Sequence, residues 1–564
     1  MDRKTALNQL RQRPHVDVLI IGAGINGIGA FRDLALNGVN TLIVDRGDFC
    51  SGASAASSHM LHGGIRYLEN GEFRLVKEAL HERNLLLKNA PHYARPLPTT
   101  VPIFKWLSGL WNAPLKFLNL LNKPAERGAV VIKIGLMAYD AFVRGQSQMP
   151  PHRFLMRDES LREFPSMNPE IICAANYYDA ALIAMERFCV ELILDAEAEG
   201  DHARALNYVS VAGAQGGRVT LRDETTGKAF EVQPRVVINA AGPWVDFANR
   251  ALGIDTKFIG GTKGSHLVLN HSELRQAIGD HEIFFENTDG RIVLINPFGD
   301  RVLVGTTDIH IDDPDQAVCD PAEETYILSL VKKVFPDIAI DPAQIVFRFS
   351  GVRPLPTADA KAAGQISRDH SIKVTEAGGQ LTFPVLSLIG GKWTTYRAFA
   401  EQAADAALKR LGGLRQRDTK SLPVGGGRDY PASQAGRTQW IAAASQQTGL
   451  SVDRLAMLFQ RYGTRARAIA ERCAAGRGQD KVLKHHPAYS QREIAFLVEN
   501  ERVIHLDDLI LRRSLLGIMG ELALPLLKEL AALAGAALGW SKTEVDGETR
   551  RVVAMLRDRH GVSL

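Results

Sequence analysis

The chain has few cysteines, and they form no recognisable redox or metal motif. Only five occur in 564 residues. They are Cys50, Cys173, Cys189, Cys319 and Cys473. None stands in a CxxC pair or at a metal-ligand spacing, which argues against haem, iron–sulfur and other metal centres. We therefore expect a reduced, cytosolic protein with no structural disulfide and no metal.

Long apolar runs and a secretory leader are also missing. Residues 1–10 are polar and lack the apolar core of a signal peptide. The most apolar stretch, 515–540, is interrupted by Glu521, Pro525 and Lys528, so it does not resemble a bilayer-spanning helix. Any association with the cytoplasmic membrane is therefore expected to be peripheral.

An excess of charge of one sign is the third absence. The chain has 67 Lys and Arg against 63 Asp and Glu, a formal charge of +4. It has no long basic tract or nucleic-acid motif, so dedicated nucleic-acid binding is not expected. With 45% hydrophobic and 23% charged residues it has an ordinary globular composition. Its length is too great for a single core.

A glycine-rich turn between a strand and a helix marks the N-terminal part. The β-branched run 16–21 precedes this turn, a helix is expected at 28–37, and a second strand at 41–44 ends at an acid. This βαβ unit predicts dinucleotide binding, because the glycines allow a tight turn and close approach of a pyrophosphate to the helix start. The expected contacts are Gly22, Ala23, Gly24, Ile25, Asn26, Gly27 and, for a ribose hydroxyl, Asp45. Spacing alone does not separate FAD from NAD.

Further along the chain, periodicity predicts a mixture of elements followed by helices alone. Helices are expected at 73–89, 182–199 and 394–411, and a strand at 235–239. Residues 260–307 alternate apolar and polar side chains, as antiparallel strands do. Pro423 and the glycines at 425–427 form a linker-like segment, which places a domain boundary near 415–430.

Several longer motifs carry a resemblance to a known family. They are SSHMLHGGIRYLE at 57–69, NAAGPW at 239–244, KGSH at 263–266, GTTD at 305–308, SGVRPL at 350–355, GGKWTTYR at 390–397 and the segment 492–513. In this order they closely resemble the FAD-dependent glycerol-3-phosphate dehydrogenases, the respiratory, quinone-linked enzymes. The resemblance covers most of the chain and selects FAD.

The resemblance implies an α/β fold of three parts. A discontinuous, Rossmann-like FAD-binding domain of the glutathione-reductase or amino-acid-oxidase type is joined to an antiparallel-sheet substrate domain and an all-α C-terminal domain. The FAD-dependent oxidoreductase region is 1–420, with FAD-binding segments at about 14–90, 170–255 and 350–412 and substrate-binding segments at about 91–169 and 256–349. The helical domain is 421–564. A homodimer is expected from the resemblance only.

The resemblance also implies further site residues. The additional FAD contacts are Ser57, Ser58, His62, Gly63, Gly64, Ala241, Gly242, Gly391, Lys392 and Thr394. The substrate site is lined by Arg66, Tyr67, Arg353, Arg368 and Lys392. Cations suit a phosphate dianion, because arginine can bind oxyanions in a bidentate manner.

The expected chemistry is oxidation of sn-glycerol 3-phosphate to dihydroxyacetone phosphate, a step of glycerol catabolism. The hydride passes to flavin, and the 2-hydroxyl proton needs an acceptor, for which His62 and His266 are the candidates. Arg353 would steer the hydroxyl or stabilise the alkoxide. With no second redox motif in the chain, the electrons need a diffusible acceptor, and the family uses membrane ubiquinone. Residues 106–121, apolar with basic flanks, fit either the membrane interface or a buried helix.

Three alternatives remain open at this level. The same motifs fit another polyol phosphate, such as erythritol 4-phosphate. The general fold is shared with amine and amino-acid oxidases, although several cations favour a phosphate over a zwitterion. The basic C-terminal residues could also suggest RNA binding, although such rows are usually solvated helix faces. They include Arg454, Arg461, Arg465, Arg467 and Arg472.

Overall fold

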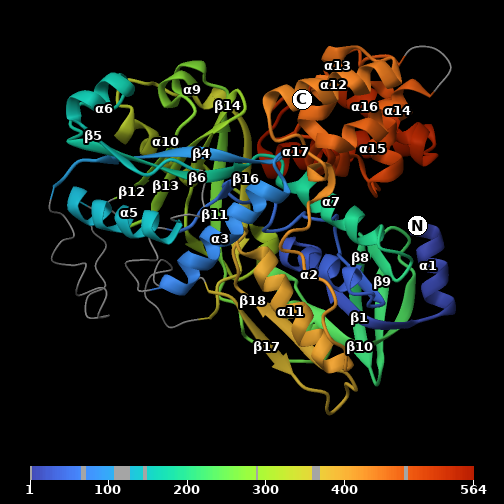
Figure 1. Cartoon of the computed structure of the whole chain (residues 1–564). Coiled ribbons are helices and arrows are strands. Elements are labelled where there is room, and N and C mark those ends of the chain that lie inside the picture. Colours follow the sequence, from blue (N-terminus) through green and yellow to red (C-terminus); the bar gives the residue numbers. More distant parts are fainter. Residues whose placement is uncertain are drawn as a thin grey trace.

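The chain folds into two large sheets and a helical C-terminal part (Figure 1). The structure is a computed structural model that describes residues 3–64, 72–106, 128–143, 149–287, 290–357, 369–475 and 480–564. The mixed α/β fold with an antiparallel-rich second sheet and a helical C-terminal part confirms the fold class expected from the sequence.

The first sheet is mainly parallel and forms the dinucleotide fold. Its strands run in the order β17, β18, β10, β1, β2, β7, and the strands from β18 to β7 are parallel neighbours. Their bounds are β1 (His15–Ile21), β2 (Thr41–Val44), β7 (Ala203–Leu206), β10 (Ala229–Asn239), β17 (Ser371–Thr375) and β18 (Val385–Ile389). The sheet is extended beside β10 by β9 (Arg218–Asp223) and β8 (Val209–Gln215).

Three helices cover this sheet, and their starts differ from the sequence expectation. Helix α2 (Ile25–Leu36) begins earlier than expected, because extended Gly24 is its N-cap. Helix α7 (Met185–Glu197) begins later than expected, since strand β6 continues to Leu182. Helix α11 (Tyr396–Leu411) also begins later. All three pack into one apolar core with the strands.

The second sheet is almost entirely antiparallel. Its order is β15, β11, β14, β13, β12, β4, β6, β3, with β16 beside β11 and β5 beside β6, and β12 with β4 is the parallel pair among these. The bounds are β3 (Met60–Leu61), β4 (Ala94–Ile103), β5 (Arg153–Met156), β6 (Cys173–Leu182), β11 (Thr262–Leu269), β12 (Glu282–Glu286), β13 (Ile292–Phe298), β14 (Arg301–Gly305), β15 (Ile309–His310) and β16 (Ile345–Arg353). The antiparallel strands expected within 260–307 are therefore confirmed.

Helices cover both sheets at their margins. Against the second sheet and its edges lie α3 (Phe73–Asn89), α5 (Ala129–Val143), α6 (Arg157–Glu163), α9 (Ser272–Ile278) and α10 (Pro321–Val334). The remaining helices of this part are α1 (Arg3–Gln12) and α8 (Val245–Ala251), which adjoin the first sheet. The helix expected at 73–89 has the bounds predicted from its periodicity.

The division into FAD-binding and substrate-binding segments stays a prediction. Strands β3 and β6 lie in sequence within the expected FAD-binding segments 14–90 and 170–255, yet both hydrogen-bond into the second sheet. The chain therefore crosses between the two sheets several times, and the second sheet begins directly after the first dinucleotide unit.

The C-terminal part is helical and has its own core. Its helices are α12 (Gln434–Thr448), α13 (Val452–Tyr462), α14 (Ala466–Ala474), α15 (Gln491–Asn500), the π-helix η8 (Asp508–Arg513), α16 (Leu524–Leu538) and α17 (Lys542–His560). This core includes Phe347 and Phe349 of β16, and the ring of His560 stacks on Phe347. The helices therefore pack directly on the second sheet, as Figure 1 shows for α17 and β16.

The close crossing of β1 and α2 leads to a stability prediction. A Cβ added at Gly27 would lie 2.0 Å from the carbonyl oxygen of Gly22. Gly27→Ala should therefore lower the free energy of unfolding by about 1–3 kcal/mol, the usual cost of overpacking. Urea denaturation of purified protein measures this difference.

The matched control is Gly547→Ala in α17, where an added Cβ meets nothing within 4 Å. It should raise the free energy of unfolding by about 0.5–1 kcal/mol, because alanine suits a helix better than glycine. Equal effects of the two substitutions would contradict the tight packing of β1 against α2.

Candidate active site

The carboxyl ends of four parallel strands meet at one edge of the first sheet. Strand β1 leads to Gly22, β2 to Asp45, β10 to Ala240 and β18 to Gly390. In open α/β sheets ligands bind outside the carboxyl ends of the strands. Three motifs that are far apart in the sequence are thereby brought to a single edge.

The glycine turn after β1 is packed against the turn after β10. Gly22 has a φ of +100°, and a Cβ there would lie 2.7 Å from the carbonyl oxygen of Ala240. The N–H of Ile25 donates to Ser54 Oγ at 3.0 Å, which fixes the first turn of α2. The N-terminus of α2 thus opens at the sheet edge, where its N–H groups favour a phosphate.

Asp45 is held by the backbone on both of its carboxylate oxygens. Oδ2 accepts the N–H of Ala23 at 2.7 Å and Oδ1 accepts that of Gly47 at 2.9 Å. Burial raises the pKa of this carboxyl group to about 6, against the lowering effect of these hydrogen bonds. Each oxygen keeps a lone pair for a further donor, as a ribose hydroxyl would require.

The residues present at this edge fit a dinucleotide cofactor. Asn26 Oδ1 is buried and accepts no hydrogen bond from the residues that the structure describes. Asn26 Nδ2 lies 3.0 Å from the position that a Cβ on Gly391 would take. The start of α2, the buried amide of Asn26 and the glycine backbone at Gly391 therefore lie close together. A bound pyrophosphate and flavin would need such an arrangement.

The turn after β18 contacts the chain both before and after β3. Gly390 and Gly391 have φ values of +74° and +97°, a conformation that favours glycine. Trp393 Nε1 donates to the carbonyl oxygen of Ser54 at 2.9 Å, and Thr394 Oγ1 donates to that of His62 at 3.3 Å. The predicted residues His62, Gly391, Lys392 and Thr394 are thus neighbours in space.

His266 lies in the second sheet close to the same loop. Its Nε2 is 2.9 Å from Ser58 Oγ, and its ring stacks on Phe349 with centroids 4.9 Å apart. Burial, and next the positive charge of Arg353, lower the pKa of His266 to about 3. The imidazole is therefore uncharged at neutral pH, and this low pKa makes it a weak base.

Arg353 is fixed by the GTTD motif. Its Nη2 donates to Thr306 Oγ1 at 3.0 Å, and its Nη1 to Asp308 Oδ1 at 3.2 Å. Gly264 leaves room for the guanidinium group, because a Cβ there would lie 2.2 Å from Arg353 Nη2. The KGSH, GTTD and SGVRPL motifs, read separately in the sequence, therefore build one cationic position near His266.

Other predicted residues lie elsewhere or outside the described part. Arg66, Tyr67 and Arg368 lie outside the described residues, as do residues 107–121 of the predicted interfacial segment. Of the remaining FAD predictions, Ser57 Oγ contacts Met185 Sδ at 2.7 Å, and the Gly63 N–H donates to Asp179. The assignments of Ser57, Gly63, Gly64, Ala241 and Gly242 to the FAD site stay predictions.

Sequence reasoning missed the residues that support the site. Gly63 is held by Asp179, which also pairs with the buried Arg83 at 2.8 Å and accepts from Tyr139. Ser54, whose Oγ accepts the N–H of Ile25 at the start of α2, is also absent from the predicted residues. No spacing pattern joins Arg83 to Asp179, because the two are distant in sequence and meet only through packing. Ser54 stands in a run of small residues that signals a turn but no partner.

Comparison with known proteins agrees with this geometry. Residues 17–397 match the family described as FAD dependent oxidoreductase, so the chain is a flavin-dependent oxidoreductase. Residues 417–545 match the C-terminal domain of alpha-glycerophosphate oxidase. The chain belongs to the family of FAD-dependent glycerol-3-phosphate dehydrogenases, and its cofactor is FAD.

The similarity extends over almost the whole chain. A glycerol-3-phosphate dehydrogenase of Synechocystis sp. is 31% identical over 96% of each chain. A mitochondrial glycerol-3-phosphate dehydrogenase of Bos taurus is 30% identical over 97% of this chain and 74% of its own. The structure of glycerol-3-phosphate dehydrogenase from Bacillus halodurans, solved with FAD, has a TM-score of 0.74 and 22% identity, covering 98% of this chain and 97% of its own. That last likeness shows the shared fold.

Proposed function

We propose that the chain oxidises sn-glycerol 3-phosphate to dihydroxyacetone phosphate and passes the electrons to a membrane quinone. The observation that carries the proposal is the position of Arg353 beside the neutral His266, in a chain that matches its family over nearly its full length. FAD, when bound, supplies the hydride acceptor. The protein supplies the cations, the proton acceptor and the orientation of the substrate.

The phosphate of the substrate is proposed to bind to the cationic side chains. Arg353 ends β16 of the second sheet, and Lys392 stands in the turn after β18 of the first sheet. Arg66, Tyr67 and Arg368 complete the proposed set. A dianion needs several fixed donors, and guanidinium groups provide them at constant charge.

The proton of the 2-hydroxyl is proposed to pass to His62 or His266. His266 has a buried Nδ1 that pairs with no described residue, and its Nε2 is oriented by Ser58. The carbonyl of His62 is oriented by Thr394, next to Lys392. Arg353 is proposed to hold the substrate oxygen as its negative charge develops.

The quinone and lipid surface are proposed as partners on the basis of α5. On one side this helix buries Ile132, Leu136 and Tyr139 in a core, while on the other Ile134 and Met137 are 61% and 56% exposed. Trp106, at the start of the predicted interfacial segment, is 50% exposed. Exposed apolar side chains of this kind suit the membrane interface. Within the described part of the chain no helix is long and apolar enough to cross a bilayer.

A homodimer is proposed from the likeness to the family alone.

The reaction is tested by mixing purified holoenzyme anaerobically with sn-glycerol 3-phosphate. The visible absorbance of oxidised flavin should bleach rapidly, and added ubiquinone should restore it. Erythritol 4-phosphate is the comparison substrate. A flavin that stays oxidised with sn-glycerol 3-phosphate, but bleaches with erythritol 4-phosphate, would replace the proposed substrate by the other polyol phosphate.

A matched pair of arginines on β16 provides the control. Arg353→Gln should lower kcat/KM by about 10- to 100-fold, since each hydrogen bond to a charged group contributes about 1.5–3 kcal/mol. Arg348→Gln should leave it nearly unchanged, because Arg348 pairs with Glu324 and contacts Gly561 near the C-terminus. Equal losses would argue against a direct role of Arg353.

The proton acceptor is tested through the pH dependence of flavin reduction. Because the pKa of His266 is about 3, its imidazole does not change charge near neutral pH. His266→Asn should slow reduction by about 100-fold or more if His266 accepts the proton. It should not shift the acid limb of kcat/KM in either case. An acid limb that disappears in this variant would contradict the neutral state assigned to His266, and an unchanged rate would leave His62 as the acceptor.

The lipid contact is tested by cosedimentation with vesicles that contain anionic lipid. Ile134→Glu with Met137→Glu should reduce the bound fraction strongly, because two charges would enter the interface. Val452→Glu is the control, since Val452 is equally exposed but lies on α13 of the C-terminal part. Undiminished binding of the α5 variant would overturn the assignment of this face to lipid.

A further inference from the structure

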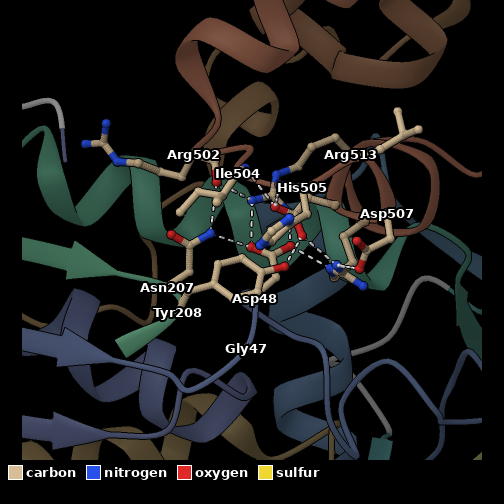
Figure 2. A network of polar contacts seen from close by, with 12 residues as sticks. Gly47, Asp48, Asn207, Tyr208, Arg502, Ile504, His505, Asp507 and Arg513 are labelled. Atoms are coloured by element: carbon tan, nitrogen blue, oxygen red, sulfur yellow. Dashed lines mark hydrogen bonds and ion pairs between the residues drawn. The ribbon is translucent and has the colours of Figure 1, made fainter. Parts of the chain in front are cut away.

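A buried carboxylate joins the cofactor loop to the C-terminal domain. Asp48 lies in the loop that follows β2 and also carries Asp45. Its Oδ2 accepts from Arg512 Nε at 2.5 Å and from Arg513 Nη1, and its Oδ1 accepts from Arg513 Nη2 at 2.9 Å. Asn207 Nδ2 donates to Oδ1 at 2.8 Å. Figure 2 shows Asp48 at the centre of this network, with Arg513 reaching it from the C-terminal helices.

The two arginines are themselves held rigidly within the C-terminal domain. Both end the π-helix η8, a form of helix that recurs at functional sites. Arg513 Nε donates to the carbonyl oxygen of Glu501 at 2.8 Å. Arg512 Nη2 donates to Asp508 at 2.7 Å and to Asp507 at 2.9 Å. The guanidinium groups therefore form a fixed surface against which Asp48 is placed.

The loop of Asp48 is the same loop that braces the glycine turn. Asp45 accepts the N–H of Ala23, and the carbonyl oxygen of Ala23 accepts the N–H of Cys50 at 2.8 Å. The carbonyl oxygen of Gly47 accepts the N–H of Tyr208 at 2.8 Å. A shift of Asp48 would therefore move the backbone on both sides of the Asp45 carboxylate.

The next turn is held from the same side. Tyr208 Oη donates to Asp508 at 2.6 Å, and Asn207 also donates to the carbonyl oxygen of Arg502 at 2.9 Å. The C-terminal domain thus holds the loop after β2 and the turn between β7 and β8, and both segments adjoin Asp45.

The charges of this network favour one arrangement. Burial raises the pKa of the Asp48 carboxyl group, but Arg513 and Arg512 together lower it below its ordinary value. Removing one member of a buried ion pair costs more than the intact pair contributes, because a desolvated charge is left behind. The pair therefore fixes the position of the loop more than it adds to overall stability.

We propose that Arg512 and Arg513 are positioning residues for FAD, acting through Asp48 to hold Asp45 in place for the ribose of the cofactor. The inference rests on the proposed role of Asp45 in binding FAD. It implies that the cofactor site is incomplete without the C-terminal domain, although none of the described residues of that domain follows a strand end of the first sheet. A binding loop that is already held in its bound conformation loses less freedom when the ligand binds, so the effect should appear in the affinity for FAD.

The test is a double-mutant cycle on FAD affinity with Asp45→Asn, Asp48→Asn and the double variant. Apoprotein of the full chain is titrated with FAD, and the quenching of flavin fluorescence gives the Kd. Asp48→Asn should raise Kd by about tenfold. Asp48→Asn should have a much smaller effect when Asp45 is already replaced, because the two residues act in series.

Two further variants separate positioning from general destabilisation. Glu493→Gln breaks the buried ion pairs with Arg454 and Arg461 inside the C-terminal domain. It should lower the melting temperature and leave Kd for FAD unchanged. Arg512→Lys keeps the charge but loses the planar group, and it serves in the same cycle if Asp48→Asn does not fold.

The outcomes distinguish this inference from the assignment on which it rests. Additive effects of Asp45→Asn and Asp48→Asn, or an unchanged Kd in Asp48→Asn, would overturn the positioning role. An unchanged Kd in Asp45→Asn would instead show that Asp45 does not bind the cofactor, whatever Asp48 does. A Kd that rises equally in Glu493→Gln would reduce the effect to loss of stability and also overturn the proposal.

Discussion

The carboxylate of Asp48 between two arginines is the contact on which the relative placement of the domains depends. The same network continues to Arg187 of α7, which donates to Glu501 at 2.8 Å and to the carbonyl oxygen of Arg513 at 3.0 Å. Buried ion pairs add little to the free energy of unfolding, but they fix the relative position of the two charged groups, since displacing one partner leaves a desolvated charge. The C-terminal helices are therefore held in one orientation against α7 and the loop after β2.

This fixed frame matters because the site is assembled from separate segments. Parallel strands place the glycine turn, Asp45 and the Gly390–Gly391 turn at one edge. The antiparallel sheet brings His266 to Ser58 in the loop before β3 and holds Arg353 on Thr306. The first sheet thus carries the glycine turn, Asp45 and the turn with Lys392, and the second sheet carries His266 and Arg353. Small movements between the sheets would separate them, so the packing of α17 and its neighbours on β16 is part of the same constraint.

The sequence predicts local features of this arrangement well and distant ones poorly. Periodicity and glycine spacing predict the strand 41–44, the helix 73–89 and the β1–turn–α2 unit. The longer motifs identify the family. The start of α7 was predicted too early, because the apolar end of β6 runs into it without a break. The sequence analysis selects no role for Asp48. Its partners Arg512 and Arg513 lie 464 and 465 residues away in the sequence, and no local pattern predicts a contact over that distance.

The long sequence distance between contacting segments also affects the order in which the protein can fold during synthesis. The first strand, the glycine turn and Asp45 are among the earliest residues synthesised. In the sheet, β1 lies between β2 and β10, and β18 lies beyond β10. Both β10 and β18 are made much later. Arg513 follows later still. Pairings between residues so distant in the chain pay a large loop-closure entropy and form late. Strand β1 can pair with β2 early, but it lacks its second neighbour until β10 has been made. The Asp48 loop lacks its arginine partners until nearly the whole polypeptide exists.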